Sequence, residues 1–334
     1  MASVLAPDIE DTARTVRATL RFVDPGDFVT RRYVSQGAEI NTGTYSDHQM
    51  AIRDGMPIRD HFDLDTHGFM IARLPSAVSD FHDKDEVDRK YEHEVEQHVA
   101  ALTGADKVIA RGWMIRTSAD LSERAKQKAE GYTHSGGIQP PAGEAHVDTN
   151  TATAQMMARA TYEKHFPDGP GFKRFLVSSF WRTFSAPPQD VPLALCDGRT
   201  SFGGEEKSNT LFIVDEFPTG DALTAPVEGE ANMIAASIFS HNPGMRWWYF
   251  SNMRADDALL FKFHDSDHSH TWRCPHTAFR DTSFAGANIR ESIECRSVAF
   301  WEYGGPLPRA GRQLRPFVHR DASDRGRPGF ARAQ

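Results

Sequence analysis

Three side chains of types that bind iron stand in one informative order: His146-Val147-Asp148 and, far downstream, His276. A His-x-Asp pair with one distant histidine is the ligand set of a facial triad, which holds Fe(II) on three sites and leaves three open for co-substrates. If the first segment is extended, residues two apart project to the same face, so His146 and Asp148 can meet one metal. The spacing therefore predicts a metal site of His146, Asp148 and His276, which are also the predicted catalytic residues.

An arginine and a serine follow the third candidate ligand as Arg290-Glu291-Ser292. The planar guanidinium of Arg290 suits a dicarboxylate co-substrate because it grips a carboxylate through two hydrogen bonds, and Ser292 can add a hydroxyl to the same group. The alternative role for Arg290 is an ion pair with Glu294 or Asp281. The order His-x-Asp, His, Arg-x-Ser favours binding of a co-substrate by Arg290 over the ion pair. It predicts an oxygenase that uses Fe(II), 2-oxoglutarate and O2.

Alternating side chains along the strand expected over residues 292–303 indicate which of them can contact the co-substrate. Alternation places Arg290, Ser292, Glu294 and Arg296 on one face. Three residues are expected to pack elsewhere, the last of them after an irregularity: Ile293, Cys295 and Val298. The candidate co-substrate residues are Arg290, Ser292, Arg296 and, on an earlier strand over 175–184, Arg182. Arg116, on the strand over 108–115, is a further candidate for the same role or for a surface ion pair.

Other histidines compete for the metal. His61 and His319 also begin His-x-Asp tripeptides. His319 has no later histidine, and His61 lies in a polar stretch that predicts a loop or a turn cap. The segment from 264 to 276 holds four histidines and could form a separate metal site or a solvated loop. We prefer His276 there, because Pro275 fixes its approach and the strand with Arg290 begins about one hairpin later.

Composition sets wider limits on the class of protein. A chain of 334 residues with 39% hydrophobic and 10% aromatic residues can build one large domain or two ordinary ones. The net charge of −8 gives no support to nucleic-acid binding. Three cysteines without CxxC spacing fit a reducing cytoplasm, and no signal peptide or membrane helix is predicted.

The pattern along the chain predicts a mainly β protein with flanking helices, built on a double-stranded β-helix or jelly-roll core. A helix is expected over 84–103, packed outside a sheet, and another over 149–166. Strands are expected over 19–23, 69–72, 108–115, 175–184, 210–214, 247–250, 258–263 and 292–303. We expect one domain over 1–304, with an N-terminal α/β extension, a lid-like loop over 118–145, an insertion near 200–245 and an Arg/Pro/Gly-rich tail over 305–334.

Several motifs resemble the hydroxylase/desaturase family that includes CmcJ of the cephamycin pathway and gibberellin-desaturase-like proteins, within the Fe(II)/2-oxoglutarate-dependent oxygenases. They span about 70 to 303 and include Trp181-Arg-Thr-Phe184, Trp248-Tyr-Phe250, Pro275-His-Thr-Ala-Phe279 and Arg290-Glu-Ser-Ile-Glu-Cys-Arg296, besides the His-x-Asp motif. The resemblance implies a jelly-roll dioxygenase that hydroxylates, desaturates or otherwise oxidises a small specialised metabolite, releasing succinate and CO2. The long spacing between His146 and His276 departs from the family, so no substrate is carried over.

Two other functions stay open on the sequence. One is a non-catalytic accessory subunit of a biosynthetic enzyme pair. The other is a cupin-like metal enzyme that does not use 2-oxoglutarate. The expected partner is a small-molecule substrate, without nucleic acid or membrane, and a homodimer is left open.

Overall fold

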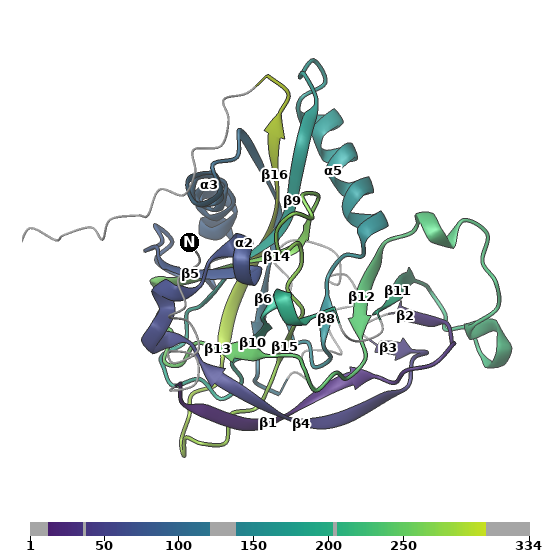
Figure 1. Ribbon diagram of the computed structural model, residues 1–334, viewed down its shortest axis with the longest axis horizontal. Coiled ribbons are helices and arrows are strands. Elements are labelled where there is room, and N and C mark those ends of the chain that lie inside the picture. Colours follow the sequence, from purple (N-terminus) through teal and green to yellow (C-terminus); the bar gives the residue numbers. More distant parts are fainter. Residues whose placement is uncertain (1–12, 36–37, 121–137, 203–205, 305–334) are drawn as a thin grey trace, which may run out of the picture.

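Two β-sheets face each other and form the body of the protein (Figure 1). The computed structural model describes residues 13–35, 38–120, 138–202 and 206–304. The smaller sheet has six strands in the order β5 (Phe69–Arg73), β14 (Asp257–Asp265), β9 (Phe172–Thr183), β16 (Glu291–Glu302), β6 (Lys107–Thr117) and β7 (Ile138–Gln139). The larger has ten: β1 (Thr15–Val23), β4 (Tyr45–Asp54), β13 (Trp247–Tyr249), β10 (Leu193–Cys196), β15 (His276–Ala278), β8 (His146–Val147), β12 (Ala235–Phe239), β11 (Glu206–Ile213), β2 (Thr30–Ser35) and β3 (Ala38–Asn41).

The smaller sheet is covered on both faces. Its inner face meets the larger sheet in one hydrophobic core, to which β9 contributes Val177 and Trp181. Its outer face meets helix α3 (Lys84–Thr103) in a second core, which takes Leu176 and Phe180 from the same strand. Consecutive residues of β9 therefore lie in different cores, as alternation along a strand requires. Two packed sheets with helices outside are the expected jelly-roll architecture.

Helix α3 confirms the expectation for residues 84–103. The side chain of Asp83 accepts a hydrogen bond from the backbone N–H of Glu86, which caps the first turn. Gly104 ends the helix at φ +70°, a left-handed conformation that glycine adopts readily. The second expected helix is α5 (Thr151–His165), which Asn150 caps by accepting from the N–H of Thr153.

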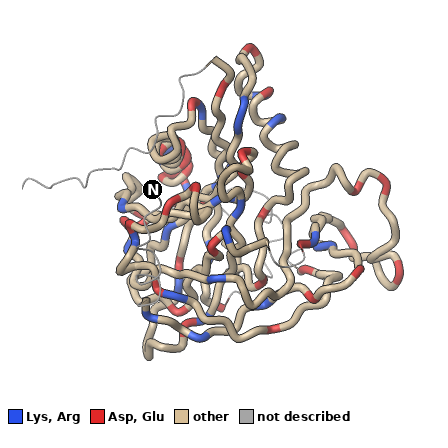
Figure 2. The backbone as a smooth tube through the Cα atoms, in the orientation of Figure 1, with Lys and Arg blue, Asp and Glu red and all other residues tan. Residues whose placement is uncertain are grey.

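The remaining helices are short, namely α2 (Leu64–His67) and the 3-10 turns η1 (Met56–His61), η2 (Gly198–Thr200), η3 (Gly220–Leu223) and η4 (Glu230–Asn232). All eight expected strands are present, most of them longer by a few residues. The stretch expected to be an insertion near 200–245 holds β11 and β12 of the larger sheet and the segment that joins them. That segment protrudes from the body and carries acidic but no basic residues between 214 and 234 (Figure 2).

One expectation about β16 is wrong. Val298 lies in the inner core with Phe300, whereas Ile293 and Cys295 lie in the outer core under α3. Alternation along β16 is thus unbroken, because the irregularity falls on the partner strand β6. There two residues, including Gly112 at φ +89°, oppose one residue of β16. Most of the expected loop over 118–145, and the whole tail over 305–334 with His319, lie outside the described residues.

Candidate active site

The two candidate histidine ligands lie directly opposite each other in the larger sheet. His146 of β8 is the Cα partner of His276 of β15 in an antiparallel pair. Side chains of directly opposite residues project to the same face and approach closely. Accordingly, the two imidazole rings lie 4.4 Å apart between centroids, and both histidines are buried at 9% and 6% exposure. Residues 130 positions apart in sequence are therefore brought together by one strand pairing.

Hydrogen bonds to the backbone orient both rings. Nδ1 of His146 donates to the carbonyl of Glu144 at 2.7 Å, and Nδ1 of His276 donates to the carbonyl of Cys274 at 3.1 Å. A carbonyl only accepts, so each Nδ1 carries a proton, and in the neutral imidazole Nε2 is then the nitrogen with the lone pair. Both acceptors lie two residues before the histidine that they orient. In the neutral form of each ring, Nε2 is thus the nitrogen that can bind a metal.

Asp148 completes the group. Its Oδ1 lies 3.2 Å from Nε2 of His146 and 3.3 Å from Nε2 of His276. The ligand atoms of the three residues all lie within 4.8 Å of one another, and no other group of this kind occurs among the described residues. Two imidazole nitrogens and one carboxylate oxygen on one side of a centre are the donor set of a facial Fe(II) site. The chemistry and the spacing of the donors fit the metal that the sequence predicts.

The electrostatics of the group favour a charged carboxylate. Burial raises the pKa of Asp148, but Arg296 and the two histidines outweigh it and hold the pKa well below its usual range. Burial lowers the pKa of His276, and the neighbouring His146 lowers it further, so this imidazole stays neutral. A metal needs an ionised carboxylate and neutral imidazoles, and these shifts favour that state at Asp148 and His276. Burial lowers the pKa of His146, but Asp148 raises it above its usual value, so a bound metal would displace a proton there.

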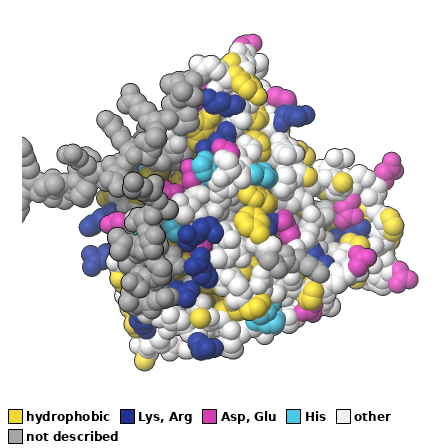
Figure 3. Space-filling model, in the orientation of Figure 1, with side chains coloured by type: hydrophobic (Ala, Val, Ile, Leu, Met, Phe, Trp, Pro, Cys, Tyr) yellow, Lys and Arg dark blue, Asp and Glu magenta, His cyan; other side chains and the backbone are white. Residues whose placement is uncertain are grey.

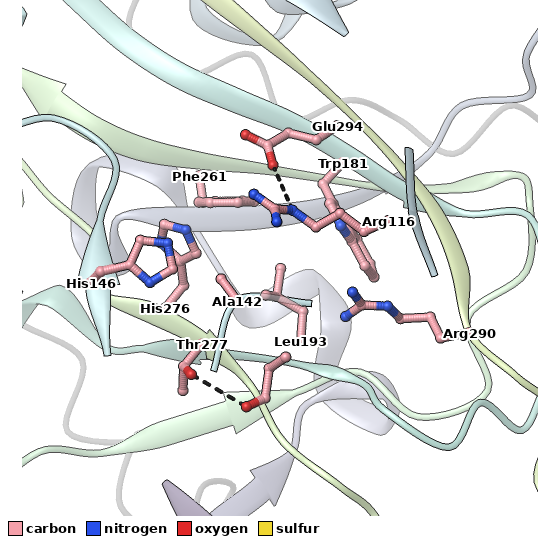
Figure 4. Close-up of a pocket in the computed structure, with 11 residues that line it drawn as sticks. Arg116, Ala142, His146, Trp181, Leu193, Phe261, His276, Thr277, Arg290 and Glu294 are labelled. Carbon is pink, nitrogen blue, oxygen red and sulfur yellow. Dashed lines mark hydrogen bonds and ion pairs between the residues drawn. The ribbon is translucent and has the colours of Figure 1, made fainter. Parts of the chain in front are cut away.

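A pocket connects this group with Arg290 (Figure 4). His146 and His276 lie at one end of it, and the guanidinium of Arg290 points in from the other. The side chains between them come from both sheets, and they include Arg116, Trp181, Leu193, Phe261, Thr277 and Glu294. The pocket is therefore a space between the sheets, with the candidate histidine ligands on the larger sheet and Arg290 directly before β16 of the smaller.

Arg290 is a buried cation without an anionic partner among the described residues. It is 1% exposed, Nη1 donates to the carbonyl of Val191 at 3.0 Å, and Nε has no acceptor. The carboxylate of Asp190 accepts from the backbone N–H of Arg290 rather than from its side chain. Burial lowers the pKa of Arg290 to about 9, and Arg116 adds to the lowering. A buried guanidinium is costly unless an anion meets it, so this one fits a carboxylate of a ligand.

The alternative ion pair of Arg290 with Glu294 or Asp281 is absent from the described part of the chain, because Glu294 has other partners. Its Oε1 accepts from Nε of Arg296 at 3.0 Å, and its Oε2 lies 3.6 Å from Nε of Arg116. Arg116 also donates to the carbonyl of Pro140 at 3.0 Å. Arg116 and Glu294 thus form a polar wall of the pocket, and the sequence analysis had assigned Glu294 no role there.

Arg182 does not reach the pocket, and its predicted contact with the co-substrate is wrong. Its guanidinium donates to the carbonyls of Leu74 and Ala255 at 2.9 and 3.1 Å, and its other partners are the hydroxyl of Tyr91 and the carboxylate of Glu94 on α3. It lies on the outer face of β9, beneath α3. The preceding residue, Trp181, faces inward and lines the pocket, with its ring 5.8 Å from the guanidinium carbon of Arg290.

Two other predicted co-substrate residues contact protein groups here. Arg296 forms an ion pair with Asp148, with Nη2 2.5 Å from Oδ2, so it contacts a candidate metal ligand. The hydroxyl of Ser292 is fully buried and lies 3.4 Å from the carbonyl of Arg116, and Ser292 does not line the pocket. Phe261 was missed by the sequence analysis. Its ring packs edge-on against His276 at 4.7 Å, and its strand, buried throughout, gave no sign of which face met the site.

The competing histidines lie elsewhere. His61 ends η1 next to Asp63, whose side chain caps α2 by accepting from the N–H groups of Asp65 and Thr66. This location agrees with the predicted turn. His264 is buried beside His268 and Trp272, and burial lowers its pKa to about 4. These histidines do not take part in the metal-type group, so the preference for His276 within 264–276 agrees with the geometry.

Comparison with known proteins gives the context of this site. A family model described as an oxidoreductase/YMDC permease-like domain matches residues 20–300. The hydroxylase/desaturase CTB9 of Cercospora beticola is 30% identical over 81% of this chain and 78% of its own. The hydroxylase/desaturase efuI of Hormonema carpetanum is 26% identical over 86% and 96%. The solved structure of NvfI, an iron and alpha-ketoglutarate-dependent endoperoxidase, covers 86% of this chain and 98% of its own, with a TM-score of 0.67 and 24% identity.

The match to NvfI concerns the fold, and it agrees with the jelly-roll core. A curated relative of the same name from Aspergillus novofumigatus, an Fe(II)/2-oxoglutarate-dependent dioxygenase, is 28% identical over 77% of this chain and 84% of its own. The family model spans most of the chain, and these three relatives cover 77% to 86% of it. The chain belongs to this oxidoreductase family, with the hydroxylase/desaturases and Fe(II)/2-oxoglutarate-dependent dioxygenases among its relatives.

Proposed function

We propose that His146, Asp148 and His276 bind Fe(II) and that Arg290 binds the distal carboxylate of 2-oxoglutarate. One observation carries the proposal. A facial donor group and a buried guanidinium, which has no anionic partner among the described residues, lie at opposite ends of the same pocket. A dicarboxylate has one end for the metal and one for the arginine. The protein is then an oxygenase in its own right, in preference to an accessory subunit or a cupin-like enzyme without 2-oxoglutarate.

The residues of the chain have separable tasks in this mechanism. The carbonyls of Glu144 and Cys274 hold Nδ1 of both histidines and so direct both Nε2 atoms toward Asp148. Trp181 and Phe261 give the pocket apolar walls, which exclude water and strengthen the charge interactions inside it. Iron with 2-oxoglutarate and O2 supplies the oxidising power that removes hydrogen from a substrate, with succinate and CO2 as co-products.

The substrate belongs to the class of small specialised metabolites. The name of one relative supports this class, since it is an aspirochlorine biosynthesis protein of Aspergillus oryzae, and other relatives are named hydroxylase/desaturases. Hydroxylation, desaturation and other oxidations share the removal of hydrogen, and they differ in how the pocket holds the substrate afterwards. We propose that the pocket residues near the metal, not the ligands themselves, decide which product forms.

An anaerobic titration tests the proposal. Purified protein is titrated with Fe(II) and then 2-oxoglutarate, and the weak visible metal-to-ligand charge-transfer band of the chelate is followed. We expect the band with the unmodified protein and its loss, at the same 2-oxoglutarate concentration, with Arg290→Ala. Bound iron without a band would favour the cupin-like alternative, and no bound iron would favour the accessory subunit. Arg254→Ala, an exposed arginine outside the pocket, is the matched control.

We propose further that the protein works in the cytoplasm on a small molecule, without nucleic acid. Cys196, Cys274 and Cys295 are buried and unpaired, which suits a reducing compartment. On the face drawn in Figure 3, basic side chains stand among acidic and apolar ones. Within the described residues, no helix has the length and apolar character needed to span a membrane. The homodimer stays a prediction, which light scattering of the purified protein measures directly.

A further inference from the structure

The two oxygens of Asp148 have different partners. Oδ1 faces Nε2 of His146 and Nε2 of His276, at 3.2 and 3.3 Å. Oδ2 forms an ion pair with Arg296, whose Nη2 lies 2.5 Å away. A close contact between opposite charges at a buried carboxylate is a strong interaction. The carboxylate is thus held in one orientation, with a single oxygen turned toward the histidines.

Arg296 reaches Asp148 from the opposite sheet and is itself held there. It lies on β16, which is paired on one side with β6 and on the other with β9. Its Nε donates to Oε1 of Glu294 at 3.0 Å, two residues earlier on the same face. Glu294 is 8% exposed and is approached on its other oxygen by Arg116. A chain of alternating charges, Arg116, Glu294, Arg296 and Asp148, therefore crosses from the smaller sheet to the metal ligands.

We propose that Arg296, fixed by Glu294, is a positioning residue that restricts Asp148 to one-oxygen binding of the metal. This inference rests on the proposed function, in which Asp148 is a metal ligand. A free carboxylate can turn and bind a metal through both oxygens, which occupies one of the three positions that co-substrates need. Arg296 withholds Oδ2 and leaves Oδ1 for the metal. Partners of this kind, one step removed from the metal, change its affinity by about 10- to 100-fold when they are removed.

The sign of the effect separates positioning from plain electrostatics. A guanidinium near a cation site repels the cation, so its removal strengthens metal binding if charge alone matters. Positioning predicts the reverse. Arg296→Lys helps to distinguish the two effects. Lysine keeps the positive charge but lacks the planar guanidinium that contacts Asp148 and Glu294 at once. Glu294→Gln leaves Arg296 in place and weakens only the contact that holds it.

Co(II) is the probe, measured by calorimetry and by its visible d–d absorption, which reports coordination geometry. We expect Arg296→Gln to weaken Co(II) binding by about 10- to 100-fold and to alter the spectrum as the second oxygen of Asp148 coordinates. Arg296→Lys and Glu294→Gln should show smaller losses in the same direction. Arg73→Gln is the matched control, because Arg73 is also an ion-paired arginine of the smaller sheet, but its partner Asp256 lies outside the pocket.

Each outcome decides between the proposals. Unchanged or tighter Co(II) binding with an unchanged spectrum in Arg296→Gln overturns the positioning role and leaves the metal site intact. Absence of Co(II) binding by the unmodified protein overturns the proposed function, and the positioning role with it. Urea unfolding of each metal-free variant identifies any that do not fold. If Arg296→Gln is one of these, Arg296→Lys and Glu294→Gln decide the question by the same two measurements.

Discussion

Two buried arginines with opposite surroundings allow a sharp test of the co-substrate site. Arg290 and Arg182 are 1% and 0% exposed. Arg182 is surrounded by acceptors, among them the carboxylate of Glu94, whereas the side chain of Arg290 has one within the described part of the chain, the carbonyl of Val191. We consider Arg290→Met and Arg182→Met, which keep a long side chain and remove the charge. The first should stabilise the ligand-free protein, and the second should destabilise it.

The structure gives the magnitudes. Burial lowers the pKa of Arg290 from its ordinary value to about 9, which corresponds to about 5 kcal/mol of unfavourable free energy for the charged form in the folded protein. Removal of the guanidinium also leaves the carbonyl of Val191 without its donor, which costs about 1–3 kcal/mol. Arg290→Met should therefore raise the free energy of unfolding by about 2–4 kcal/mol. Arg182→Met breaks a buried ion pair with Glu94 and should lower it by about 3–5 kcal/mol.

Binding of 2-oxoglutarate should respond in the opposite way. A charge-assisted contact with a carboxylate contributes about 1.5–3 kcal/mol, so Arg290→Met should weaken 2-oxoglutarate binding by about 10- to 100-fold. Arg182→Met should leave it unchanged, because Arg182 lies under α3. The assays are urea unfolding of the ligand-free proteins and calorimetry of 2-oxoglutarate with the Co(II)-loaded proteins. A destabilised Arg290→Met that still binds 2-oxoglutarate normally would refute the reasoning.

Three further predictions concern the metal and pH. His146→Ala or His276→Ala should abolish Co(II) binding measured by calorimetry, whereas His61→Ala should leave it nearly intact, and the reverse pattern would show that the ligands are misassigned. Co(II) at about 100 times its dissociation constant should stabilise the protein by about 2.7 kcal/mol in urea unfolding, and EDTA should remove this gain; an equal gain in His146→Ala would place the metal elsewhere. Because the anion binds the protonated form of Arg290, 2-oxoglutarate affinity should hold steady from pH 7 to 8 and decline as pH rises through about 9; a flat calorimetric profile to pH 10 would contradict the lowered pKa.

The sequence predicted the long elements well, because their signals are local. Helix α3 shows helical spacing between Asp83, which caps it, and Gly104, which ends it. The strands β6, β9, β14 and β16 are long and rich in apolar residues. The candidate ligands were found by residue type and order alone. The structure then brings His146, Asp148 and His276 within reach of one metal ion.

The sequence did not indicate which side chains of the smaller sheet face the pocket. Both faces of this sheet are covered, one by the larger sheet and one by α3, so the alternation of polar and apolar residues that marks an exposed face is missing. Arg182 and Trp181 could each have faced the pocket, and the wrong one was chosen. The strands that carry the histidines, β8 and β15, have two and three residues, too few for any periodic signal. Their pairing depends on contacts distant in sequence.

The pairing of β8 with β15 makes the site a marker of folding. A shift of one residue in this pairing would turn one histidine to the far face of the sheet and dismantle the donor group. The two strands are separated by 130 positions, and contacts of such long sequence separation are slow to form. The rate at which refolding chains gain tight binding of a divalent cation therefore measures how fast these two strands pair in the native register. Chains that are compact but have β8 and β15 paired in another register would not bind the cation and would give no signal.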